Sequence, residues 1–156
     1  MTAEDLAKRI QDELGESWIP RLYRDRILKL RTRSYNFDYL KPSGRIAIQH
    51  TLLGIELKIG RKRLLCPDLA TARYLSVFAR LGCVDVAIPY DITKISRLAD
   101  DLESAWFRMI LLTDQSATGK VRTRLRGLLF ATIRTEILAA GAGTTIPEFR
   151  QNTRQR

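Results

Sequence analysis

The residues best suited to chemistry lie close together in the segment GIELKIGRKRLL, at positions 54–65. Glu56 and Lys58 are two residues apart in a run that is otherwise apolar. If this run is a β-strand, both side chains lie on one face, with Cα atoms about 6–7 Å apart. A carboxylate on a strand can bind Mg²⁺, and a neighbouring lysine can help activate a water and stabilise charge on a phosphate. The pair is therefore a candidate catalytic site for phosphodiester hydrolysis.

The same spacing also fits a strand with one solvated face, on which Glu and Lys form an ordinary charge pair. A metal site needs a further acid, and Asp38 is the only acid between Ile27 and Ile55. If Asp38 reaches Glu56, the two carboxylates bind one Mg²⁺. If Asp38 does not reach Glu56, the domain has this fold but binds no metal there. Mg²⁺ is thus the cofactor expected of a catalytic form, and a non-catalytic form needs none.

The order of elements around this pair resembles the core of the restriction-endonuclease-like nucleases, the PD-(D/E)xK superfamily, and within it the archaeal Holliday-junction resolvases. In that family an I-E-x-K strand is followed by a strand, a helix with an L-x-x-F-A ending before a glycine, and another strand. The matching residues here are Ile55, Glu56, Lys58, Leu75, Phe78, Ala79 and Gly82. The resemblance implies an Mg²⁺-dependent endonuclease on structured DNA, with Glu56 as metal ligand and Lys58 as assisting base or charge stabiliser, in a homodimer. The family's upstream acid often follows a proline, whereas Asp38 follows Phe37.

The charge of the chain points to an anionic partner. A formal net charge of +10 on 156 residues opposes folding, and it favours nucleic acid, either DNA or RNA, as the partner. Arginine outnumbers lysine in the basic clusters, which suits phosphate binding. With Tyr35 as an adjacent aromatic, the candidate nucleic-acid-binding residues form three clusters: Arg21, Arg24, Arg26, Lys29, Arg31 and Arg33; then Arg61, Lys62 and Arg63; then Lys120, Arg122, Arg124 and Arg126.

Two alternatives compete with a nucleic-acid face. The aromatics Tyr23, Tyr35, Phe37 and Tyr39 are either exposed beside the arginines, where they would stack on bases, or part of the core. The segment 84–115 is rich in acids, so the charge is segregated along the chain. A non-enzymatic adaptor that docks an acidic protein partner through its arginine faces would also explain that segregation.

Several classes of protein are disfavoured. Two cysteines and one histidine are too few for a Cys/His zinc site, and their spacing fits no zinc pattern. The cysteines are expected to be semi-buried thiols in a reducing compartment. The first residues are charged and amphipathic, and no apolar run is long enough to cross a bilayer. We therefore expect a cytoplasmic protein without a membrane partner.

The periodicity predicts one α/β domain over residues 1–146, with helical N- and C-terminal segments, and a flexible basic tail over 147–156. Helices are expected at 2–14, 20–35, 67–82, 91–112 and 120–143, and strands within 45–66 and 84–90. A helix between strands commonly crosses one face of a sheet and leaves the flanking strands parallel. The fold class expected is therefore a mixed central sheet flanked by helices, restriction-endonuclease-like if the resemblance holds.

Overall fold

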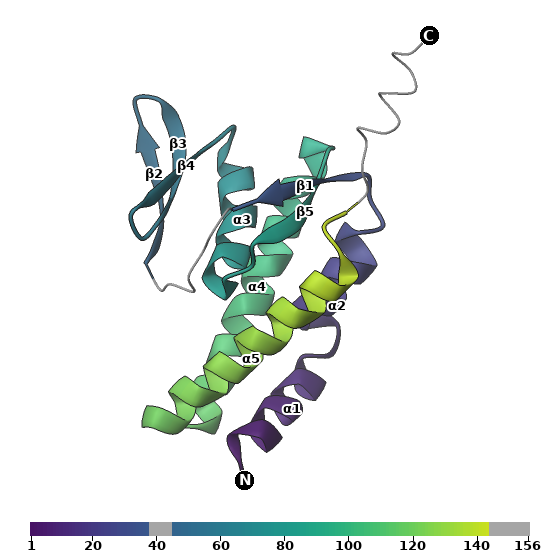
Figure 1. Cartoon of the computed structure of the whole chain (residues 1–156), viewed down its shortest axis with the longest axis vertical. Coiled ribbons are helices and arrows are strands. Elements are labelled where there is room, and N and C mark those ends of the chain that lie inside the picture. Colours follow the sequence, from purple (N-terminus) through teal and green to yellow (C-terminus); the bar gives the residue numbers. More distant parts are fainter. Residues whose placement is uncertain (38–44, 144–156) are drawn as a thin grey trace.

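The computed structural model of the chain describes residues 1–37 and 45–143, which form an α/β arrangement with helical segments at both ends (Figure 1). The helical elements in chain order are α1 (Ala3–Leu14), η1 (Gly15–Ser17), α2 (Ile19–Leu22), η2 (Tyr23–Ile27), α3 (Leu69–Leu81), α4 (Ile92–Ser116) and α5 (Gly119–Ala140). The strands are β1 (Thr32–Asn36), β2 (Ile46–Thr51), β3 (Gly54–Ile59), β4 (Lys62–Cys66) and β5 (Asp85–Pro89).

The predicted first helix is confirmed, and its ends have local causes. Thr2 and Asp5 form a capping box, in which the Thr2 hydroxyl accepts from the Asp5 amide at 3.1 Å and the Asp5 carboxylate accepts from the Thr2 amide. Gly15 ends the helix with φ +54°. The buried stripe of Leu6, Ile10 and Leu14 recurs every fourth residue and packs toward α4 and α5.

The second predicted helix is wrong over its C-terminal part. After Pro20 the chain forms α2 and then the π-helical turn η2, in which the Leu28 amide bonds to the Tyr23 carbonyl at 2.9 Å. From Thr32 the chain is the strand β1. The apolar stripe of the arginine-rich stretch predicts a helix, but pairing with β5, far away in the sequence, outweighs that local preference.

The strands form two small antiparallel sheets in the part of the chain that the structure describes, not one mixed central sheet. β2, β3 and β4 form a meander, as the alternation over 45–66 predicts. β5 pairs antiparallel with β1, from Thr32 opposite Pro89 to Asn36 opposite Asp85. The predicted parallel crossover from 54 to 90 is therefore wrong, because β5 takes β1 as its partner instead of β3 or β4.

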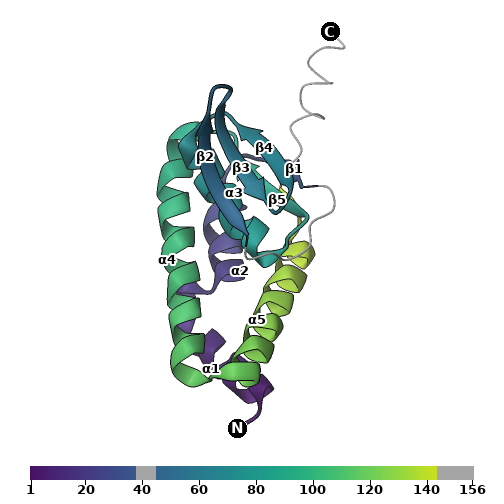
Figure 2. The same cartoon turned by 90° about the vertical axis from the view of Figure 1, so that its left-hand side faces the viewer.

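Helix α3 is the centre of the core. Asp68 caps it by accepting from the Thr71 amide at 2.7 Å, and Gly82 ends it at φ +80°. Its side chains are buried on nearly all sides, since the β2–β3–β4 sheet covers one face and α4 another (Figures 1 and 2). Figure 2 also shows α4 and α5 diverging from their short link at residues 117–118, with α1 near that link.

Tyr23 joins three elements around this core. Its hydroxyl donates to the Gly141 carbonyl at 2.6 Å and accepts from the Ala87 amide at 2.9 Å. Its ring packs edge-on against Phe78 of α3, with ring centroids 5.8 Å apart. The side chain is fully buried, so η2, β5 and the residue after α5 are held by one phenol.

The two cysteines, Cys66 and Cys83, are free thiols as predicted, but both are buried and not semi-buried. None of the helices within residues 1–37 and 45–143 is long and apolar enough to cross a membrane.

Alkaline pH should destabilise the fold. Burial raises the pKa of Tyr23 and of Cys83 to about 12 each. Each group is protonated in both states well below its unfolded pKa, which is about 8.5 for cysteine and about 10 for tyrosine, so its contribution to stability is complete there. Above that pKa the unfolded chain loses the proton first, and the free energy of unfolding falls by about 1.4 kcal/mol per pH unit for each group, from about pH 8.5 for Cys83 and from about pH 10 for Tyr23, up to about pH 12. Urea unfolding at pH 8 and pH 11 measures the loss. The Cys83→Ala variant should show a shallower decline, and equal slopes would contradict the assignment.

Candidate nucleic-acid interface

Strand β3 places Glu56 and Lys58 on the same face of the three-stranded sheet, as the alternation predicts. The intervening Leu57 and the following Ile59 are buried toward α3, whereas Glu56 and Lys58 are half-buried on the other face. We call this second face the outer face of the sheet. Figure 2 views it directly, and no described helix or strand lies in front of it. The two residues are thus on a surface that a partner can reach.

The pairing of β3 with β2 and β4 determines which residues lie beside Glu56 and Lys58 on the outer face. Glu56 lies opposite Gln49 of β2 and Leu65 of β4, and Lys58 lies opposite Ala47 and Arg63. Within the described residues the Glu56 carboxylate forms no ion pair, and its Oε1 atom is buried without a hydrogen-bond partner. Glu56 and Lys58 therefore share a face but do not bind each other.

The described residues do not assemble a site for Mg²⁺. No group of three His, Cys, Asp or Glu side chains among them could hold a metal ion. Glu56 supplies one carboxylate, and Asp38 lies outside the described residues. Phe37, the last described residue before that gap, accepts a hydrogen bond at its carbonyl from the Lys62 ammonium, and Lys62 lies on the face opposite Glu56. We therefore derive no metal-dependent step.

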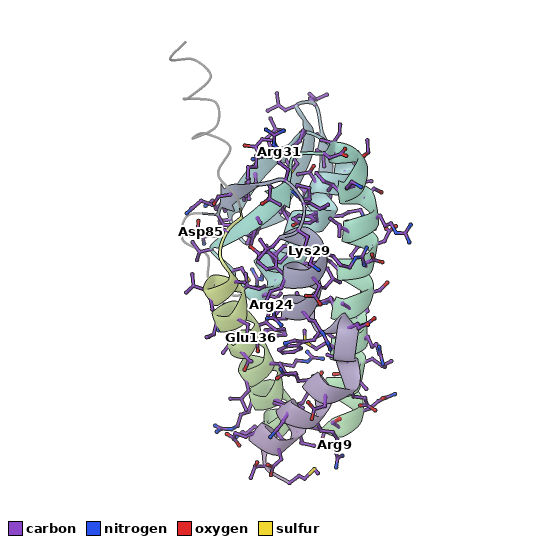
Figure 3. The ribbon with its side chains drawn as sticks, turned by 90° about the vertical axis from the view of Figure 1, so that its right-hand side faces the viewer. Arg9, Arg24, Lys29, Arg31, Asp85 and Glu136 are labelled. Carbon is purple, nitrogen blue, oxygen red and sulfur yellow. The ribbon has the colours of Figure 1, made fainter. Side chains whose placement is uncertain are left out.

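The first arginine cluster is largely neutralised within the protein. Arg26 pairs with Asp101 of α4 at 2.6 Å, and Arg24 lies 3.6 Å from Glu136 of α5. Arg21 lies 3.9 Å from Asp25, one turn along the chain. Figure 3 shows Arg24 next to Glu136, with Lys29 and Arg31 farther along the same side of the molecule. Arg33 is exposed on β1.

The aromatics near this cluster do not form a stacking surface within the described residues. Tyr23 and Phe37 are fully buried, which confirms the core alternative for both. Tyr35 is half-buried and packs against the Phe37 ring at 5.0 Å between centroids. Tyr39 lies outside the described residues.

The third cluster is neutralised in the same way. Arg122 and Arg126 both contact Asp114 near the end of α4, at 3.7 and 2.5 Å. Arg124 binds Glu4 of α1 at 2.7 Å, and this hydrogen bond lowers the pKa of the Glu4 carboxyl. Lys120 is exposed at the start of α5 and forms no ion pair within the described residues.

The acids of α4 are the internal counter-charges of the fold. Arg73 of α3 binds both Glu103 and Asp100, and these carboxylates, Glu103 first, raise its pKa well above the ordinary range of arginine. Asp101 and Asp114 pair with arginines of the first and third clusters. Every acid of α4 thus faces an arginine from another element, and the acidic segment is explained by packing.

Two residues of the second basic cluster, Arg61 and Arg63, and the neighbouring Lys58 differ from these helix arginines. Lys58, Arg61 and Arg63 form no ion pair within the described residues. Lys58 and Arg63 are directly opposite each other in the register, which places two like charges side by side on the outer face. Like charges in this position destabilise a sheet. Lys62 differs, because it lies on the inner face and donates to the Phe37 carbonyl.

A further basic surface was missed by the sequence reasoning. A pocket of about 470 Å³ lies between η2 and the start of α4, and Lys29, Lys94 and Arg97 contribute to its walls. Lys94 and Arg97 belong to the stretch in which acids outnumber bases, so composition concealed them. Their spacing of three residues, which places both on one side of a helix, is the signal that could have found them.

No family model, curated protein or solved structure matches this chain.

Proposed function

We propose that this protein binds nucleic acid through the outer face of the β2–β3–β4 sheet. The observation that carries the proposal is the pair Lys58 and Arg63, which are directly opposite each other and have no acid partner within the described residues. Arg61, in the turn between these strands, extends the same cationic surface. Phosphate groups would relieve the repulsion between the paired cations and form charge-assisted hydrogen bonds with them.

The distribution of partners favours the sheet over the helices as the binding surface. Residues 45–66 contain five cations and one acid, Glu56. In contrast, the arginines of η2 and α5 are largely engaged by acids of α1, α4 and α5. An anionic ligand would have to displace those acids, whereas Lys58, Arg61 and Arg63 require no such exchange within the described residues. The sequence-based assignment of Arg21–Arg33 and Lys120–Arg126 to the binding face is therefore not retained in the proposal.

Salt-dependent binding tests the proposal. Fluorescence anisotropy would be measured with labelled duplex, single-stranded and branched DNA and with duplex RNA, at a series of salt concentrations. If Lys58, Arg61 and Arg63 contact three phosphates, the plot of log K against log salt concentration for duplex DNA should have a slope of about −2 to −3. Absence of binding to every one of these ligands at low salt would contradict the proposal, and would leave the adaptor for an acidic protein as the surviving hypothesis.

The nuclease remains a separate prediction, because binding does not require it. The catalytic roles of Glu56 and Lys58 depend on a second carboxylate, whereas the homodimer depends on the restriction-endonuclease-like resemblance. A cleavage assay with and without Mg²⁺, run beside the Glu56→Ala variant, decides the question. Mg²⁺-dependent cleavage that is lost in this variant supports the catalytic pair, and cleavage that survives the substitution excludes it.

A further inference from the structure

The tip of the β2–β3 hairpin presents two leucines to solvent. Thr51 and Gly54 are paired across the strands, so Leu52 and Leu53 alone form the loop. Their exposed fractions are 107% and 78%, the highest of any large apolar side chains among the described residues. Leu65, next to Gly54 on β4, is also exposed. Two consecutive apolar residues at the end of the hairpin thus remain largely exposed within the described chain.

This loop departs from the ordinary chemistry of tight hairpins. Two-residue loops favour Asn-Gly or glycine-containing pairs, and exposed loops are generally polar. Here the turn is held by the residues around the leucines. The Thr51 hydroxyl accepts from the Leu53 amide and donates to the Gly54 carbonyl, both at 3.2 Å, and Gly54 has φ +125°, which favours glycine. A sequence that supports a turn while placing leucines at its tip indicates a functional site.

The outer face behind the tip is arranged in layers. Gln49 and Glu56 lie directly opposite each other, two residues back from the paired Thr51 and Gly54. Gln and Glu side chains read the edges of adenine and cytosine. Lys58 and Arg63 form the next layer, about 13 Å back from Gly54 along the strand. The order from the tip is therefore apolar, polar and cationic.

This order matches the radial order of a nucleic-acid duplex. The major groove of B-DNA is about 8.5 Å deep, with base pairs at its floor and phosphates at its rim. Pairing of β3 with β4 reaches Ile55 and Cys66, so the two-stranded part that can enter the groove is the tip at residues 51–54. A tip that reaches the floor would leave Lys58 and Arg63 just outside the rim, within side-chain reach of the phosphates. Leucine side chains inserted between base steps partly unstack the bases, as the apolar wedges of proteins that bind the minor groove do.

We propose that Leu52 and Leu53 are a wedge that inserts between base pairs of a duplex. The inference rests on the proposed nucleic-acid binding and narrows its substrate to base-paired nucleic acid that can be locally unstacked.

Charge placement favours a duplex over an anionic membrane as the occupant of the tip. A hairpin that dips into a lipid surface needs cations close to its apolar end, where the headgroups lie. The charged side chain nearest the tip along β3 is Glu56, and the cations are farther back. A carboxylate in this position opposes an anionic lipid surface, whereas on a duplex it faces base edges.

A duplex that carries 2-aminopurine at a central position tests the wedge, since the fluorescence of this base rises when it is unstacked. Anisotropy of a second label on the same duplex reports binding independently. Wild-type protein should raise the 2-aminopurine fluorescence on binding. The double variant Leu52→Ala, Leu53→Ala should still bind, with an unchanged salt slope, but should lose that rise. Leu138→Ala is the matched control, because Leu138 is an exposed leucine on α5.

The outcomes separate the two proposals. If wild-type protein binds without a rise in 2-aminopurine fluorescence, or if the double variant keeps the rise, the wedge is overturned and nucleic-acid binding stands. If no anisotropy change occurs, nucleic-acid binding itself fails, and the wedge with it. Vesicles of phosphatidylserine and phosphatidylcholine form the last arm. Suppose that wild-type protein binds these vesicles, that the double variant does not, and that both change the 2-aminopurine fluorescence of the duplex equally. This result would overturn the wedge and assign the tip to a lipid surface.

Discussion

Replacement of both Lys58 and Arg63 by alanine should weaken binding of duplex DNA by about tenfold for each cation at low salt. The two side chains are neighbours on the outer face and have no acid partner within the described residues, so each is available to a phosphate. The slope of log K against log salt concentration should become shallower by about two, since two phosphate contacts are lost. Anisotropy titrations at several salt concentrations measure both quantities. The folded state should gain slightly, because a pair of opposed like charges is removed.

The matched control removes the same net charge elsewhere. Lys8 and Arg9 are exposed on α1, have no ion pair within the described residues, and lie far from the sheet (Figures 1 and 3). The variant Lys8→Ala, Arg9→Ala should bind nearly as wild type does. If the two double variants lose affinity equally, attraction is a property of net charge, and the sheet has no special role.

The substitution Tyr23→Ala should lower the free energy of unfolding by about 3–5 kcal/mol. The phenol is fully buried, packs against Phe78, and bonds to the Ala87 amide and the Gly141 carbonyl. Its removal leaves a cavity beside α3 and two backbone groups without their partner. Urea unfolding followed by circular dichroism gives the value.

Two further variants divide this effect into its causes. Tyr23→Phe keeps the ring and loses only the hydroxyl, so it should cost about 1–3 kcal/mol. Tyr90→Ala is the control, because Tyr90 is a half-buried tyrosine and its truncation should cost less than that of Tyr23. Equal losses for Tyr23→Ala and Tyr90→Ala would show that Tyr23 does not join the elements as described.

The parts of the fold that local rules control could be predicted from the sequence. The ends of α1 and α3 follow from side-chain caps at Thr2 and Asp68 and from glycines at positions 15 and 82. The meander follows from alternation over 45–66, because one face of the sheet packs on α3 and the other is exposed. These signals lie within a few residues of the elements they define.

The parts that depend on distant partners could not be predicted. β1 forms because Thr32–Asn36 pairs with Asp85–Pro89, and the helical stripe before it gave no indication of that pairing. The same pairing removes β5 from the meander and divides the strands into two sheets. The basic clusters show the same limit. Composition reveals the excess of arginine, but only the packed helices reveal that α4 neutralises much of it.

Only part of the candidate site could be predicted from the sequence, because the other part depends on pairing between strands. The common face of Glu56 and Lys58 follows from a period of two. The opposition of Lys58 to Arg63 depends on strand register, which the sequence specifies only through the turn at Gly60 and Arg61. From the sequence alone, the leucines of the hairpin tip are indistinguishable from strand residues. The observed register, with Thr51 opposite Gly54, shows that they form the loop.

The most direct test of the central claim is a map of the residues that a duplex contacts. ¹⁵N-labelled protein would be titrated with a short duplex, and shifts of the backbone amide signals would be followed by nuclear magnetic resonance. We predict that the largest shifts fall within β2, β3, β4 and their turns, at residues 46–66, while α1 and α5 change little. Saturable shifts confined to α1, α4 or α5, with the sheet unaffected, would contradict it.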